Sequence, residues 1–220
     1  METFYNILTV IYLSMILRIV IAGFKKYKEL QFPFQFMFWS AVLDFITELL
    51  GTVTTLLDIV NTKLFIVYSV LSFCLYLLFI NYSNSNMQFN LRRRSLLLLP
   101  ISILALIFIY GKNFFNINFY SYIISCCIIV ILTLYSILVA IKKRNVNFAV
   151  LGFYVFIFIT ATFDFAITSF FDLIIYVFKS KPFEQVKIVH LAYGIFVYYF
   201  YYRLLFSAAQ TKWLFQKKHL

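Results

Sequence analysis

The chain has 220 residues, of which 64% are hydrophobic, 22% aromatic and only 12% charged. Soluble domains are about 25% charged and about 45–50% apolar, so this composition excludes an ordinary water-soluble fold. The formal net charge is +11, but membrane proteins accumulate Lys and Arg in short cytoplasmic loops, so the charge does not predict nucleic-acid binding.

Seven segments are apolar enough to cross a bilayer, which takes about 20 mainly apolar residues. They are residues 4–24, 32–60, 64–80, 95–110, 119–141, 148–178 and 188–207. No Pro-, Gly- or Ser-rich linker separates them, so residues 1–220 are predicted to form one all-α membrane domain, a seven-transmembrane helical bundle. Glu2 and the lack of a basic residue before the first segment argue against a cleaved signal peptide.

The basic residues orient this bundle. Thirteen Lys and Arg residues flank one set of segment ends, whereas five flank the other set. The positive-inside rule places the larger set in the cytoplasm, which puts the N-terminus outside and the C-terminal tail, 208–220, in the cytoplasm. The larger set comprises Lys25, Lys26, Lys28, Arg92, Arg93, Arg94, Lys142, Lys143, Arg144, Arg203, Lys212, Lys217 and Lys218.

Residues 1–82 resemble residues 119–210 in the order of their features, with segment 95–110 as a connector. The motifs FYNILTVIYL and LDFITELL correspond to FYSYIISCCI and FDFAITSF, which aligns Asp44 with Asp164. The match predicts a parallel repeat about an axis along the membrane normal and resembles the three-plus-one-plus-three architecture of sugar facilitators. No membership of that family follows, because relatives of these facilitators carry a proline–glutamine signature, and none of the three prolines here precedes a glutamine. Such matches also arise by chance in a Phe-rich chain.

Ionisable residues at membrane depth are the candidate site. Asp44 and Glu48 are four residues apart, which predicts one helix face and a separation of about 6 Å. Two carboxylates this close in a low dielectric resist ionising together, so one is expected to hold a proton near neutral pH. Asp164 lies at mid-depth, and Arg18 is expected either to pair with Asp44 or Glu48 or to reach the cytoplasmic surface. A buried ion pair that holds helices together is the structural alternative to a site for protons, cations or a polar solute.

Other residues lie nearer the outer ends of the segments. His190 and Tyr193 share a helix side and predict either an external vestibule or ordinary satisfied polar residues. Asp58 and Asp172 are expected to reach interfacial water. The aromatic run 193–206 is interpreted as lipid- and helix-facing packing surface.

No cofactor, disulfide or metal site is predicted. Cys74, Cys126 and Cys127 lie inside apolar segments, where cysteine behaves as a small hydrophobe, and metal-ligand spacing with histidine is absent.

Three functions fit these features. The first is a small-solute or ion/proton-coupled transporter or facilitator in a bacterial cytoplasmic membrane. The second is a receptor or regulatory or effector subunit whose basic loops contact a cytosolic partner, with an oligomeric pore as a variant. The third is an intramembrane lipid-modifying enzyme, which the lack of a phosphate loop or nucleophile motif disfavours. The substrate- or ion-binding residues expected for the first are Asp44, Glu48, Asp164, Arg18, Tyr68, Tyr193 and His190.

Overall fold

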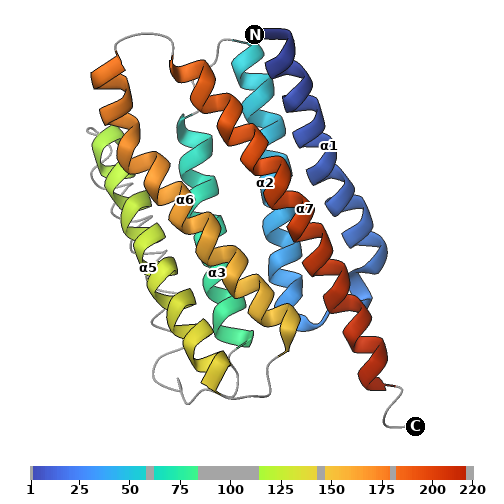
Figure 1. Ribbon diagram of the computed structural model, residues 1–220. Helices are drawn as coiled ribbons and strands as arrows, with labels where there is room; N and C mark the ends of the chain where they lie inside the picture. The colour runs from blue at the N-terminus through green and yellow to red at the C-terminus, as the bar shows by residue number, and fades with distance from the viewer. Residues whose placement is uncertain (1, 58–61, 84–113, 143–146, 179–181, 217–220) are drawn as a thin grey trace.

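A computed structural model describes residues 2–57, 62–83, 114–142, 147–178 and 182–216, which form six α-helices and no strand (Figure 1). A short 3-10 turn, η1 (Tyr27–Glu29), joins the first two helices. The predicted segment 95–110 lies outside the described residues. The helices are α1 (Glu2–Lys26), α2 (Phe32–Leu56), α3 (Thr62–Ser83), α5 (Phe114–Lys142), α6 (Phe148–Phe178) and α7 (Pro182–Gln216).

Several helix ends differ from the predicted ones, and the largest differences are at the end of α2, at the start of α5 (Phe114 rather than residue 119) and at both ends of α7. Helix α2 ends at Leu56 rather than at residue 60, and α7 runs for 35 residues, so that it continues into the predicted tail. Hydropathy marks the part of a helix that lies in lipid, whereas backbone capping decides where the helix begins and ends. Pro182 suits a first helical position because the N–H that proline lacks would have no partner there. At 1.5 Å per residue α7 is about 50 Å long, which exceeds the roughly 30 Å hydrocarbon core.

The six helices form a closed ring. Each packs against the next in the order α1, α2, α3, α5, α6, α7, and α7 packs back on α1, while α2 touches α7 and α3 touches α6 across the interior. Helices α1, α3, α5 and α7 run in one direction and α2 and α6 in the other (Figure 1). We call the end of the ring that carries the exposed residues Lys25, Lys26, Lys28 and Lys142 the basic end.

The outer surface of the ring is apolar. Large hydrophobic side chains such as Ile131, Leu138 and Phe196 are 66%, 53% and 61% exposed, whereas Asp44 and Thr133 are buried. A soluble protein rarely exposes such continuous apolar surface. Five helices contain stretches long and apolar enough to cross a membrane, and α3 adds the shorter apolar stretch Val67–Ser83. The protein is therefore a multi-pass membrane protein whose helices contact the lipid bilayer.

Hydroxyl side chains within the helices bond to their own backbone. Thr9, Ser14 and Thr133 donate to the carbonyl oxygens four residues earlier, over 3.0, 2.7 and 2.6 Å. An unpaired hydroxyl costs free energy in a medium without water, so this bonding lets apolar helices carry Ser and Thr. Asn147 caps the start of α6, because its side-chain oxygen accepts a hydrogen bond from the Ala149 N–H at 3.0 Å.

Aromatic side chains fill the interior toward the basic end. Phe34, Phe79 and Phe153, from α2, α3 and α6, are each 0% exposed, and their ring centroids lie 5.6–5.9 Å apart. The Tyr201 ring packs on Phe153 at 5.4 Å, and its hydroxyl donates a hydrogen bond to the backbone oxygen of Met37. We call Phe34, Phe79, Phe153 and Tyr201 the aromatic layer, and it forms the floor beneath the polar residues described next.

Candidate functional site

A cavity of about 360 Å³ lies inside the ring above the aromatic layer. Helices α1, α2, α3, α6 and α7 all contribute to its wall, and we call it the main cavity. It is lined by six of the seven predicted site residues, namely Asp44, Glu48, Asp164, Tyr68, Tyr193 and His190. Tertiary packing therefore brings together residues that lie up to about 150 positions apart in the sequence.

Asp44 is the most deeply buried of these carboxylates, at 4% exposure. The hydroxyl of Tyr198 on α7 donates a hydrogen bond to its Oδ2 over 2.8 Å. The other oxygen, Oδ1, is buried and has no hydrogen-bond partner among the described residues. A buried acceptor left unpaired is costly, so a group that donates to Oδ1 or neutralises it would be stabilised there.

Glu48 lies one helical turn further along α2 and is half-buried. The hydroxyl of Tyr12 on α1 donates to its Oε1 over 3.3 Å. The rings of Tyr12 and Tyr198 meet edge to face, with centroids 5.5 Å apart. One tyrosine pair from α1 and α7 thus holds both carboxylates of α2.

Gly194 lets Tyr12 take this position. A Cβ at Gly194 would lie 2.5 Å from Cε2 of Tyr12, closer than two carbon atoms can approach. Because Gly194 has no side chain, the Tyr12 ring can pack against the α7 backbone beside the main cavity.

Replacing Gly194 with alanine should push the Tyr12 ring away from Glu48. The lost hydrogen bond, worth about 1 kcal/mol, should lower ligand affinity of the main cavity about fivefold. Isothermal titration of the detergent-purified protein with a small hydrogen-bonding cation such as methylammonium measures this affinity, with Gly152→Ala as the matched control. A Cβ at Gly152 would meet Leu204 at 2.5 Å, and neither residue lines the main cavity. Equal losses in the two variants would contradict the role given to Gly194.

Asp164 on α6 faces the carboxylates of α2 from the opposite part of the wall and is half-buried. The neighbouring residue, Phe163, stacks on Tyr193 of α7 with ring centroids 3.6 Å apart and planes 23° apart. The hydroxyl of Tyr193 is buried and has no hydrogen-bond partner among the described residues. The main cavity thus contains two unpaired polar atoms, on Asp44 and on Tyr193.

The two ends of the main cavity differ. Tyr201, which belongs to the aromatic layer, lines it toward the basic end. His190 lines it nearer the start of α7, and its side chain is exposed. Packed rings therefore lie between the polar residues and the basic end.

Arg18 does not reach the main cavity. Its side chain is exposed, and its guanidinium lies 4.9 Å from the centre of the Tyr202 ring on α7. The expected pairing with Asp44 or Glu48 is therefore absent from the described residues, and the carboxylates are instead held by tyrosine hydroxyls. Arg18 points away because it lies six residues beyond Tyr12, about 240° around the helix axis at about 100° per residue.

Replacing Arg18 with glutamine should therefore leave ligand affinity at the main cavity within about twofold of the wild type. The cation–π contact at an exposed site contributes only about 0.5–1 kcal/mol to stability. The same isothermal titration measures this affinity. A tenfold loss of affinity in the variant would show that Arg18 does act on the carboxylates.

The interpretation of run 193–206 as packing surface holds for only part of it. Tyr199 and Phe200 are 51% and 47% exposed, but Tyr198 and Tyr201 are 8% and 1% exposed and line the main cavity. The sequence does not single out Tyr198 and Tyr201, because Tyr199 and Tyr202 have the same three-residue spacing on another face of α7. No sequence signal marked Tyr12 either.

Asp58 and the side chain of Asp172 lie outside the described residues, so their expected contact with interfacial water is untested. Cys74, Cys126 and Cys127 are free cysteines. No group of three His, Cys, Asp or Glu side chains suited to a metal ion occurs in the part of the chain that the structure describes.

The lining of the main cavity is acidic and aromatic. It holds three carboxylates and several tyrosines, and none of its described lining residues is Lys or Arg. No protein-family model, curated protein or solved structure matches the chain.

Proposed function

We propose that this protein is a small transporter or facilitator that carries a cationic solute across the membrane and binds it in the main cavity. The observation that carries the proposal is the gathering of Asp44, Glu48 and Asp164 around one cavity whose described lining has no Lys or Arg. Carboxylates at membrane depth are costly and usually belong to substrate or ion pathways.

The lining suits an organic ammonium ion. Tyrosine rings attract a cation over their faces, and carboxylates neutralise its charge. The unpaired Oδ1 of Asp44 and hydroxyl of Tyr193 supply hydrogen-bonding atoms for such a ligand. The volume of about 360 Å³ is at the small end of the range of about 300–1,000 Å³ for small-molecule sites, which favours a small solute.

The ring arrangement supports transport by two related halves. A twofold axis through the ring would exchange α1, α2 and α3 with α5, α6 and α7, and would exchange the α2–α7 contact with the α6–α3 contact. Asp44 and Asp164 would then be equivalent residues on α2 and α6. Parallel repeats around a central site let one half move against the other, which exposes the site to each side in turn.

We further propose seven spans with the N-terminus outside and the C-terminus in the cytoplasm of a bacterial cell. The last turn of α3 and the first turn of α5 lie at opposite ends of the ring (Figure 1), which is what a span between α3 and α5 requires. The basic end would then be cytoplasmic, and the aromatic layer would close the main cavity on that side.

Uptake into liposomes tests the proposal. Purified protein is reconstituted, and the initial uptake of radiolabelled choline, methylammonium and guanidinium is measured against liposomes without protein. At least one of these cations should enter faster and be displaced by the others, while glucose and glutamate should neither enter nor compete. Uptake equal to that of the protein-free liposomes for all three cations would contradict the proposal.

A receptor for the same ligand is the second candidate. Helix α7 supports it, because one continuous helix carries His190 and Tyr201 in the cavity wall and then runs on to Gln216 beyond the basic end. A ligand that shifts α7 would therefore move a surface that a cytosolic partner can contact. Saturable cation binding without uptake would favour the receptor over the transporter.

A further inference from the structure

A second cavity lies beside the main cavity, between α3, α5 and α6. Its volume is about 50 Å³, and we call it the small cavity. Five residues line both cavities, so a ligand in one would lie close to a ligand in the other; they are Tyr68, Ser69, Tyr76, Thr160 and Asp164.

Oxygen atoms dominate the polar lining of the small cavity. Four aliphatic hydroxyls, those of Ser69, Ser72, Ser125 and Thr160, come from three helices and surround the same space as the carboxylate of Asp164. None of its described lining residues is Lys, Arg or His. Hydroxyl and carboxylate oxygens are ligands for hard cations, whereas soft metals prefer thiolate or imidazole.

Thr160 shows how a hydroxyl here becomes an acceptor. Its Oγ1 lies 3.0 Å from the carbonyl oxygen of Phe156 and 3.1 Å from that of Ile157, to which it donates its proton. The proton is thus used within α6, and the remaining lone pairs of Oγ1 are left for a donor or a cation.

Charge and size narrow the choice of cation. A single carboxylate compensates one positive charge, whereas a divalent ion would leave an uncompensated charge in a low dielectric. One water needs about 10–15 Å³, so the small cavity has room for an ion with one or two waters. Its other walls include the buried apolar residues Phe73, Ile129 and Ala161, and the volume leaves no space for an organic ammonium ion as large as choline.

We propose that the small cavity binds one sodium ion through the Asp164 carboxylate and the hydroxyls of Ser69, Ser72, Ser125 and Thr160. Asp164 and Tyr68 would lie between this ion and a solute in the main cavity, so the ion could couple to solute transport. That coupling rests on the proposed function. The binding itself does not depend on transport and can be measured without solute.

Binding of ²²Na⁺ to the detergent-purified full-length protein tests the proposal. One ion per chain should bind and be displaced by unlabelled Na⁺ or Li⁺, but not by equal concentrations of K⁺ or Rb⁺. The Asp164→Asn variant should lose binding. Displacement by K⁺ as effective as that by Na⁺, or no binding above the Asp164→Asn background, would overturn the assignment.

Ser125→Ala keeps the test decisive if Asp164→Asn fails to fold. Ser125 lines the small cavity and not the main one, and losing one oxygen ligand should weaken Na⁺ binding about tenfold. The matched control is Ser136→Ala, on the same helix, because Ser136 is buried but lines neither cavity and bonds to the Leu132 carbonyl at 2.8 Å. Equal Na⁺ affinity in the two variants would contradict the proposed ligand set.

The two proposals can fail separately. Choline binding that persists while Na⁺ binding is absent would remove the sodium site alone. Na⁺ binding that persists while neither choline, methylammonium nor guanidinium binds or enters would remove the solute site alone.

Discussion

Replacing Asp44 with asparagine and Glu48 with glutamine together should lower cation uptake by at least about a hundredfold. The amides keep the size of the side chains and can still accept hydrogen bonds from the Tyr198 and Tyr12 hydroxyls. They cannot neutralise a cation, and leaving a buried charge without its partner costs about 3–5 kcal/mol. The measurement is the initial rate of uptake per inserted protein molecule.

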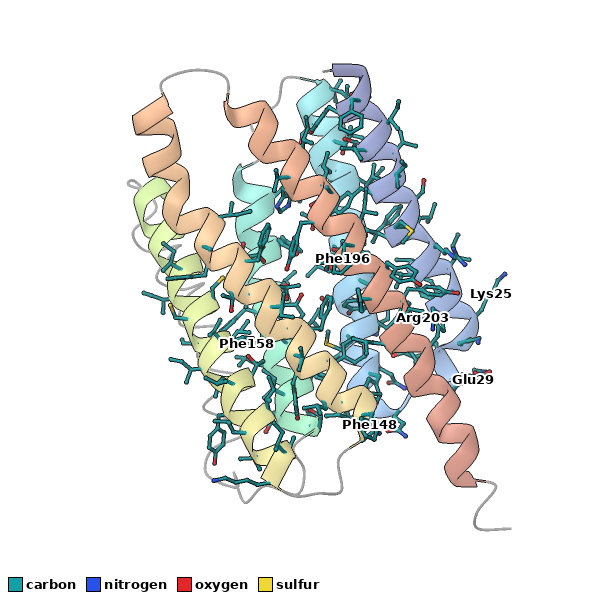
Figure 2. All side chains as sticks on the ribbon, in the orientation of Figure 1. Lys25, Glu29, Phe148, Phe158, Phe196 and Arg203 are labelled. Carbon is teal, nitrogen blue, oxygen red and sulfur yellow. The ribbon has the colours of Figure 1, made fainter. Side chains whose placement is uncertain are left out.

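The control for this double variant is Glu29→Gln. Glu29 is the exposed carboxylate of η1 near the basic end (Figure 2) and does not line the main cavity. Cation uptake by the Glu29→Gln variant should equal that of the wild type. Size-exclusion profiles and helix content should match for all three proteins, so that lost uptake reports the site and not assembly. Uptake by the double variant above one tenth of the wild-type rate would contradict a carboxylate site.

Replacing Phe153 with alanine should cause the largest loss of stability among single substitutions in the aromatic layer. Phe153 is fully buried, and its ring meets those of Phe34, Phe79 and Tyr201 at 5.6, 5.6 and 5.4 Å. Truncating a packed Phe leaves a cavity and costs about 3–5 kcal/mol. The midpoint of thermal denaturation in detergent should therefore fall clearly below that of the wild type.

The same substitution should open a path through the aromatic layer. In liposomes the variant should leak small cations down their gradient without saturation, because the ring that fills the floor of the main cavity is gone. Phe148→Ala is the matched control on the same helix, since Phe148 is 86% exposed and packs little. An unchanged midpoint together with an unchanged leak would show that Phe153 does not seal the main cavity.

Much of the architecture followed from composition. Apolar runs predicted the described helices because a bilayer requires every backbone group to be bonded within its own segment. The ends of α6 agree with the predicted residues 148–178, since one apolar run continues without a breaker. The ends of α7 did not follow, because helical bonding continues past the part that lies in lipid.

The sequence also predicted part of the candidate site. Few ionisable residues lie at membrane depth, so the cost of burying them picked out Asp44, Glu48 and Asp164 without any knowledge of packing. The first two, four residues apart on α2, both line the main cavity. Whether seven spans and a true repeat exist stays a prediction, because segment 95–110 lies outside the described residues.

The sequence alone thus determined that this is a helical membrane protein with a small set of deep carboxylates, because the free energy of placing a residue in lipid depends on its chemistry. It could not determine the rotation of each helix. Helix α1 is apolar on all sides, so nothing in its pattern shows that Tyr12 faces inward and Arg18 outward. Only tertiary packing, through the fit of Tyr12 against Gly194 and of Tyr201 against Phe153, decided which aromatic residues border the cavity and which face lipid.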